Sequence, residues 1–194
     1  GIPQEESEEI FKDEFKDNQI SAEAVTRGTT EVHSIIDEKL YLSHDGVDFV
    51  DNWETYAPDY YLTVGETHSQ YEFFIDLQTT FNNSNQWMSC FLGARVQQNS
   101  GDGGIATDPS AGFWVAICKD RATVYPGSTG QWHQGLAQIT LPESAETMHT
   151  YIIVDDGQCL YYYMVLSSGE RHLLLKADVS GEKIIITNAD GEKI

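Results

Sequence analysis

Two alternating segments decide the fold of this chain: QYEFFIDLQT at residues 70–79 and WMSCFLGARV at residues 87–96. In the first segment Phe73, Ile75 and Leu77 fall on one side and Glu72, Asp76 and Gln78 on the other, and a period of two is typical of a strand with two unlike faces. The second segment alternates as well, and the polar run at residues 82–85 between them favours a turn. The sequence therefore predicts two strands joined by a turn.

The second segment has one row of unusual composition. Its first row is apolar and contains Met88, Cys90, Leu92, Ala94 and Val96. Its second row contains Trp87, Ser89, Phe91, Gly93 and Arg95. The second row is neither a plain apolar core face nor a plain solvated one. Two interpretations stay open: these rings line an exposed ligand-binding surface, or they fill the core while the Leu92 row faces a covering loop. Tryptophan is usually mostly buried, whereas Arg95 is costly to bury without a partner.

The remainder of the chain has short strand-like runs separated by turns. The turns are marked by Gly, Asp and Pro, as at Asp45-Gly46 and Asp155-Asp156-Gly157. We find no convincing amphipathic helix and no repeat of fixed period, which favours an antiparallel sandwich or barrel. The 194 residues suit one domain of that kind. The sequence predicts an all-β chain, with a flexible acidic N-terminal segment at residues 1–10 and a single β-sandwich domain at residues 11–194.

The chain is strongly acidic. It has 11 Lys and Arg residues against 31 Asp and Glu residues, a formal net charge of -20. Such a charge repels phosphates and anionic lipid headgroups, so we expect no nucleic-acid partner. No run of 18 or more apolar residues occurs, so no membrane-spanning segment is expected. The excess acid is explained most simply by solubility, and divalent-cation affinity is the alternative.

The three cysteines, Cys90, Cys118 and Cys159, are widely spaced. Their odd count and spacing match neither a disulfide framework nor a zinc signature, so they are expected to be small buried hydrophobes. One disulfide with one remaining thiol is the alternative. A start at Gly-Ile-Pro rather than Met indicates that a targeting segment is not included. Together with many Tyr and Trp and few Lys residues, this predicts an exported protein, extracellular or at the cell surface. Membership in a larger multidomain protein stays open.

Several pieces of the chain share an order with a known superfamily. They are LYLSHDG at 40–46, QYEFFIDL at 70–77, FLGARV at 91–96, GFWVA at 112–116, and the runs 151–154 and 160–163 around an Asp-Gly turn. In this order they resemble the concanavalin A-like lectin/glucanase superfamily, in its laminin-G-like bacterial branch, over residues 40–187. The resemblance implies a jelly roll of two curved antiparallel sheets, with a concave outer face that commonly binds sugars.

The resemblance implies a function for the row that contains Trp87, Phe91 and Arg95. Aromatic faces stack on the apolar faces of sugar rings, and an arginine fork binds hydroxyls or a uronate carboxylate. The expected function is a non-catalytic carbohydrate-binding module. Its ligand-binding residues are expected to be Trp87, Phe91, Arg95, Trp114, Tyr125 and Trp132.

Catalytic motifs give less support. A glycoside hydrolase needs two carboxylates across the scissile bond, and the Glu-x-Asp-x-x-Glu pattern of the superfamily's glucanases is absent from the sequence. Glu72 and Asp76 come nearest, and a solvated strand face explains them more simply. Neither Gly-x-Ser-x-Gly nor HExxH occurs. Two alternatives stay open: a glycoside hydrolase or lyase of the same fold, and a structural or adhesive domain of a larger surface protein.

No motif requires a cofactor, and calcium is the ion that the loop acids suit. Hard cations take oxygen ligands from carboxylates and loop carbonyls. The calcium candidates are Asp45, Asp48, Asp102 and Asp108. Ordinary turn chemistry is the alternative for each, since Asp favours turns.

Overall fold

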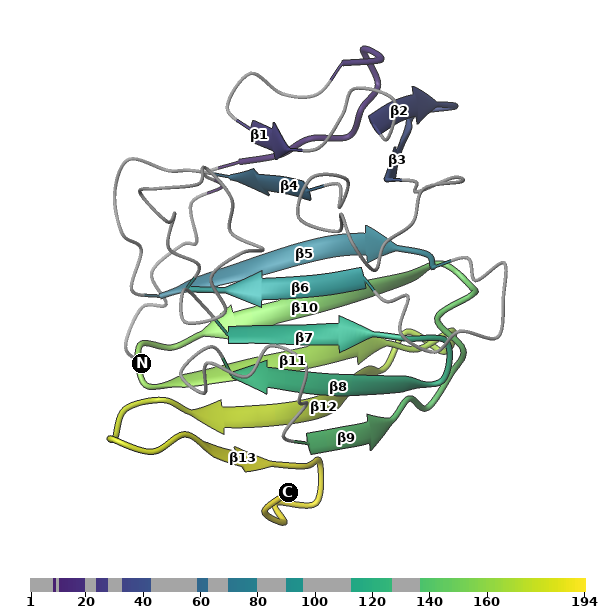
Figure 1. The fold of residues 1–194 in the computed structure, drawn as a ribbon. Coiled ribbons are helices and arrows are strands. Elements are labelled where there is room, and N and C mark those ends of the chain that lie inside the picture. Colours follow the sequence, from purple (N-terminus) through teal and green to yellow (C-terminus); the bar gives the residue numbers. More distant parts are fainter. Residues whose placement is uncertain are drawn as a thin grey trace, which may run out of the picture. The chain divides into compact units, whose positions relative to one another are not determined.

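The structure is a computed structural model that describes residues 9, 11–19, 24–27, 33–42, 59–62, 70–79, 90–95, 113–126 and 137–194. The chain divides into two compact units, Gly1–Glu66 and Thr67–Ile194. Every regular element among the described residues is a strand, and every strand pairing is antiparallel (Figure 1). The prediction of an all-β chain is confirmed. Of the predicted flexible segment only Glu9 is described, and the single domain over residues 11–194 stays a prediction.

The first unit contains two short ladders. Their strands are Ala24–Arg27 (β1) paired with Asp59–Leu62 (β4), and His33–Ile36 (β2) paired with Lys39–Leu42 (β3). Asp37 and Glu38 connect β2 to β3 with φ values of 51° and 59°. Positive φ at both central residues matches a turn whose twist suits an antiparallel hairpin.

The second unit contains two antiparallel sheets, and five strands form the first. In chain order they are Tyr71–Leu77 (β5), His149–Asp155 (β10), Cys159–Val165 (β11), Arg171–Asp178 (β12) and Ile185–Thr187 (β13). Their order in the sheet is β13-β12-β11-β10-β5. Strands β10 to β13 form the meander that the turns between them predict. Strand β5 pairs with β10, with Ile75 opposite Tyr151.

Four strands form the second sheet, in the order of the chain. They are Cys90–Ala94 (β6), Phe113–Ile117 (β7), Arg121–Pro126 (β8) and Ala137–Thr140 (β9). The chain reverses tightly at Lys119-Asp120, and the amide of Cys118 donates to the carbonyl of Arg121 at 2.8 Å. In Figure 1 this sheet lies in front of the five-stranded one.

The two segments that decide the fold are both strands, but they do not pair with each other. Strand β5 is bonded to β10 and β6 to β7, so the chain changes sheet between them. The second strand ends at Ala94, because Arg95 has a φ of 52° and leaves the extended conformation. Alternation reveals the faces of a strand, whereas its partner depends on contacts remote in sequence. The predicted turn at residues 82–85 lies outside the described residues.

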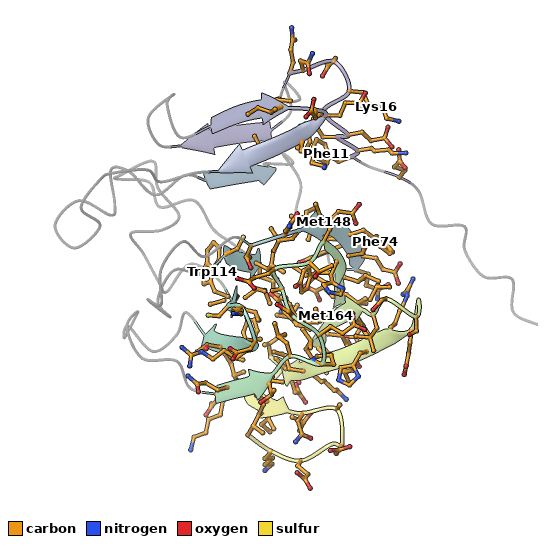
Figure 2. The ribbon with its side chains drawn as sticks, turned by 90° about the vertical axis from the view of Figure 1, so that its right-hand side faces the viewer. Phe11, Lys16, Phe74, Trp114, Met148 and Met164 are labelled. Atoms are coloured by element: carbon orange, nitrogen blue, oxygen red, sulfur yellow. The ribbon has the colours of Figure 1, made fainter. Side chains whose placement is uncertain are left out.

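One cluster of buried apolar side chains draws on both sheets. It includes Leu92 and Val115 from the four-stranded sheet and Tyr151, Leu160 and Met164 from the five-stranded sheet. Burying a large apolar side chain of this kind contributes about 1.5–3 kcal/mol. Figure 2 shows Met164 between Trp114 on one side of the unit and Phe74 on the other. The Leu92 row therefore faces the core, as the first interpretation of β6 requires.

The hydroxyl groups of two buried tyrosines in this cluster differ in their hydrogen bonding. The hydroxyl of Tyr162 donates to the carbonyl of Leu92 at 3.2 Å and so connects the two sheets. The hydroxyl of Tyr151 is buried and has no hydrogen-bond partner within the described part of the chain. Burial raises the pKa of Tyr151 to about 12 and raises the pKa of Tyr162 well above its ordinary value.

Replacing each hydroxyl should therefore have unlike effects. Tyr162→Phe is expected to lower the free energy of unfolding by about 1–2 kcal/mol, because the buried carbonyl of Leu92 loses its donor. Tyr151→Phe removes a buried hydroxyl that bonds to nothing described, so it should leave the free energy of unfolding unchanged or raise it by about 1 kcal/mol. Urea unfolding of both variants measures the difference. Equal destabilisation by the two substitutions would contradict this account.

Candidate functional site

Trp114 lies on strand β7 and points away from the core cluster. Its neighbours Phe113 and Val115 belong to that cluster, and successive side chains of a strand point to opposite faces. Gly93 and Tyr125 are its partners in register on the two adjacent strands. Trp114 is nevertheless only 7% exposed. The indole faces the predicted side of the sheet but presents little surface to a ligand.

Arg95 is held in a bidentate ion pair. Its Nε and Nη2 each donate to a carboxylate oxygen of Asp155 at 2.7 Å. Asp155 is 2% exposed, ends strand β10, and also accepts the amide of Gly157 at 2.9 Å. The bond to Asp155 raises the pKa of Arg95. The pair connects the two sheets, and it supplies the partner that the sequence indicates Arg95 must have.

The other predicted site residues are described in part or not at all. Trp87 and Trp132 lie outside the described residues, as do the calcium candidates Asp45, Asp48, Asp102 and Asp108. Phe91 and Tyr125 lie on β6 and β8, and their side chains are outside the description. Of the six predicted ligand-binding residues, the structure thus describes the side chains of Trp114 and Arg95. The six stay a prediction.

The described residues give little support to metal binding or to thiol chemistry. There, no group of three or more His, Cys, Asp or Glu side chains is arranged to hold a metal ion. Asp156, in the turn between β10 and β11, accepts the amides of Gln158 and Cys159, which is ordinary turn chemistry. All three cysteines are described and none is in a disulfide. Burial raises the pKa of Cys90 to about 11, which disfavours the reactive thiolate form.

The outer face of the five-stranded sheet carries a row of apolar and aromatic side chains in which Phe74 is exposed, Tyr161 and Tyr163 are partly exposed and Ile152 is only 1% exposed. In register across four strands, Ile152 lies opposite both Phe74 and Tyr163, and Tyr163 lies opposite Leu173. Tyr161 is two residues from Tyr163 and shares its face. We call Phe74, Ile152, Tyr161, Tyr163 and Leu173 the aromatic face.

The rings of the aromatic face offer flat surfaces. Phe74 is 51% exposed, and Tyr161 and Tyr163 are half-buried. The two tyrosine rings are 6.5 Å apart between centroids and inclined by 14°. Arg171 lies 5.6 Å from the centroid of Phe74, and Lys176 lies 5.6 Å from that of Tyr161. Cations at this distance are attracted to the ring face and help to fix its orientation.

Hydrogen-bonding groups surround these rings. Thr150 donates to Asp76 at 2.5 Å, and the hydroxyl of Tyr161 donates to Asp156 at 3.3 Å. The backbone amide of Cys159 is the main cause of a lowered pKa of Asp156, which keeps that carboxylate ionised and able to accept. The arrangement combines ring faces with polar groups that can exchange hydrogen bonds with a hydroxyl-rich ligand.

Sequence reasoning missed this face for an identifiable reason. Phe74 shares its side of the strand with Glu72 and Asp76, so that side reads as solvated. In Cys159–Leu166, Tyr161 and Tyr163 alternate with Leu160 and Met164, which lie in the core. Two tyrosines at a spacing of two opposite an apolar row were therefore a usable signal. What the sequence could not reveal is that β11 lies two strands from Phe74.

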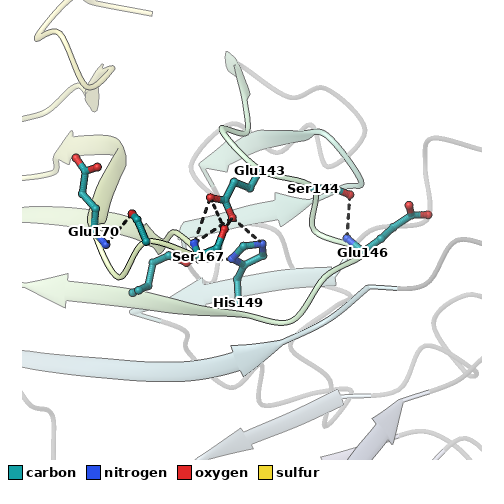
Figure 3. Close-up of polar contacts among 8 residues, drawn as sticks. Glu143, Ser144, Glu146, His149, Ser167 and Glu170 are labelled. Atoms are coloured by element: carbon teal, nitrogen blue, oxygen red, sulfur yellow. Dashed lines mark hydrogen bonds and ion pairs between the residues drawn. The ribbon is translucent and has the colours of Figure 1, made fainter.

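A second polar cluster joins Glu143, His149 and Ser167 (Figure 3). The hydroxyl of Ser167 donates to both carboxylate oxygens of Glu143 at 2.7 and 2.8 Å, and its amide donates at 3.1 Å. The Nε2 atom of His149 is 3.6 Å from Glu143. The carboxylate is central and Ser167 bonds to it rather than to His149, which is not the nucleophile–base–orienter order of covalent catalysis. The cluster connects residues 141–148 to the turn after β11.

This cluster predicts a specific loss of stability in acid. The hydroxyl of Ser167 is the main cause of a pKa of Glu143 below its ordinary value of 4.5. A carboxyl group with a lowered pKa in the folded state contributes stability above its unfolded pKa and loses it as the pH falls through the folded one. Ser167→Ala should therefore show a smaller loss of unfolding free energy between about pH 6 and about pH 3 than the wild type.

Ser168→Ala is the matched control, because Ser168 accepts only the amide of Glu170 among these contacts. Urea unfolding at both pH values gives the comparison. An acid dependence of Ser167→Ala equal to that of the wild type and of Ser168→Ala would contradict the role assigned to Glu143.

Within the described part of the chain there is also no helix with the length and apolarity needed to cross a bilayer. In comparisons with known proteins, no family model, no curated protein and no solved structure matches this chain.

Proposed function

We propose that this chain is a non-catalytic carbohydrate-binding module of an exported bacterial protein. Its fold would be a two-sheet sandwich of the concanavalin A-like jelly-roll type, as the sequence resemblance implies. The observation that carries the proposal is the aromatic face, where exposed Phe74 and the nearly parallel rings of Tyr161 and Tyr163 lie on one sheet surface.

Aromatic rings are suited to sugars because a pyranose presents apolar C–H groups on one face and hydroxyls around its edge. A ring stacked on the apolar face removes both surfaces from water, while polar groups beside it satisfy the hydroxyls. The aromatic face has both components, with Asp76, Thr150 and Asp156 beside the rings. The proposal thus moves the binding surface from the Trp114 side to the sheet whose rings meet solvent.

A non-catalytic role is supported by the placement of the carboxylates. Glycoside hydrolysis needs one carboxyl group on each side of the scissile bond. On the aromatic face, Glu72 and Asp76 come from the same strand, and Asp76 is already bonded to Thr150. Glu143 is bonded to Ser167 in the separate cluster. Neither arrangement is the opposed pair of a hydrolase.

The structural or adhesive alternative is favoured by one observation. Arg171 and Lys176 already lie over two of the rings, so these rings have partners within the chain. A protein of this kind would retain its fold and bind no soluble glycan.

The test uses two adjacent phenylalanines that point to opposite faces of β5. A panel of immobilised polysaccharides first identifies a ligand, and release of reducing sugar from it is assayed in parallel. Phe74→Ala should weaken binding about tenfold, whereas Phe73→Ala should leave it unchanged once folding is verified by circular dichroism. Phe73 is 37% exposed and lies opposite the core residue Ile153.

Each outcome selects one function. Binding that depends on Phe74 without release of reducing sugar supports the proposal, and release supports the hydrolase or lyase. No binding and no release would leave the structural role. Repeating the binding assay with added calcium and with a chelator tests whether Asp45, Asp48, Asp102 or Asp108 holds an ion that the module needs.

A further inference from the structure

His149 is a buried titratable residue that the proposed function does not use. It begins strand β10 and is 4% exposed. Its Nδ1 atom lies 3.0 Å from the carbonyl oxygen of Val165. A carbonyl oxygen only accepts hydrogen bonds, so Nδ1 must carry the hydrogen. In the neutral ring, Nε2 is then left as an acceptor.

The surroundings of Nε2 do not suit an acceptor. The atom is buried and has no hydrogen-bond partner among the residues that the structure describes. Its neighbour is Oε2 of Glu143 at 3.6 Å, which is too long for a hydrogen bond and is itself an acceptor. The two oxygens of Glu143 are held by Ser167, which keeps the carboxylate in place. As long as Nε2 carries no proton, two acceptor atoms face each other. A proton on Nε2 would let it donate a charge-assisted hydrogen bond to Oε2 of Glu143.

No other charged group described near His149 competes with Glu143. On the same loop, Glu146 is paired with Lys119 at 3.6 Å. On β5 the residue opposite His149 is Leu77, and the adjacent Asp76 is bonded to Thr150 on the outer face. From β11 comes the carbonyl of Val165. On β12 the nearest titratable residue of the inner face is His172, two strands from His149 and in register with Met164.

We propose that His149 and Glu143 form a proton-operated latch on residues 141–148. Uptake of one proton from solvent at Nε2 gives an imidazolium that donates to Val165 through Nδ1 and to Glu143 through Nε2. Residues 141–148 are then fastened to the turn after β11. When the proton leaves, Nε2 and the carboxylate oppose each other, and the segment opens more often.

The latch acts where the chain passes from one sheet to the other, between β9 and β10. Backbone bonds hold the same segment on its other side: the amide of Ala145 donates to Lys119 at 2.8 Å, and the amide of Thr79 donates to Ala145 at 3.0 Å. Opening of the latch therefore exposes a crossing between the sheets rather than an isolated loop tip.

Hydrogen exchange tests the latch at the amides of Ala145 and Ser167. Their opening equilibrium constants in the wild type should be more than about twofold larger at about pH 8 than at about pH 5.5. His149→Asn retains a donor for the carbonyl of Val165 and has no titrating nitrogen, so its change should stay below about twofold. Glu143→Gln still accepts from Ser167 and can donate to neutral Nε2, so it should also respond by less than about twofold.

Equal pH dependence in the wild type and in His149→Asn would overturn the proposal. So would a wild-type response of equal size at the amides of β7, because that would reflect global unfolding rather than a local latch. If His149→Asn does not fold, Glu143→Gln decides alone: a response equal to that of the wild type overturns the latch. The test does not depend on any glycan, so it stands or fails independently of the proposed function.

Discussion

Arg95→Leu is expected to lower the free energy of unfolding by about 3 kcal/mol. The substitution leaves the carboxylate of Asp155, which is 2% exposed, without the two guanidinium bonds of 2.7 Å that compensate its burial. Arg95 is itself 39% exposed, but Asp155 is buried, and removing the partner of a buried charge is costly because that charge stays desolvated. The only other donor to Asp155 among the described hydrogen bonds is the amide of Gly157.

A double-mutant cycle separates this cause from lost packing. Arg95→Leu combined with Asp155→Leu replaces the pair by two apolar side chains and should recover at least about half of the loss. Lys119→Ala is the control for an exposed pair, since Lys119 and Glu146 are both largely exposed, and it should cost less than about 1 kcal/mol. Urea unfolding measures all variants. A cost of Arg95→Leu no larger than that of Lys119→Ala would show that the pair does not hold the sheets together.

Replacing both tyrosines of the aromatic face by alanine is expected to weaken glycan binding about 50-fold, with single replacements near tenfold each. Each ring contributes buried area together with a stacking contact, and every 1.4 kcal/mol corresponds to a tenfold change in affinity. Because both side chains are partly exposed and lie outside the core cluster, the variants should remain folded. Isothermal titration with the glycan found in the panel provides the affinities.

Phenylalanine replacements are the matched controls for this prediction. Tyr161→Phe loses the hydrogen bond to Asp156 but keeps the ring, and Tyr163→Phe likewise keeps its ring. Both should retain affinity within about threefold of the wild type. Unchanged affinity in the double alanine variant would exclude stacking on Tyr161 and Tyr163 as the source of binding.

The sequence predicts the strands and their faces well. The alternation in β6 places Leu92 and Ala94 in the core and Phe91 and Gly93 on the other row, and the structure has Leu92 and Ala94 in the core cluster. It does not predict that β5 and β6 belong to different sheets, because the period of two is the same whichever strand is the partner. The sequence also does not predict the end of β6, because nothing in the local pattern indicates the positive φ of Arg95.

The candidate site is harder to obtain from sequence because exposure depends on what covers a face. Trp114 points away from the core as the alternation indicates, yet it is only 7% exposed, and an alternating pattern contains no information about exposure. Phe74, beside two acidic residues, reads as an ordinary solvated position until β10 and β11 bring Ile152 and Tyr163 into register with it.

Nuclear magnetic resonance of the aromatic side chains during glycan titration tests the central claim most directly. The ring signals of Phe74, Tyr161 and Tyr163 should shift in proportion to one another as ligand is added, while the indole signal of Trp114 stays unchanged. Shifts confined to Trp114 and its neighbours, or no shift in any ring at saturating glycan, would contradict binding on the aromatic face.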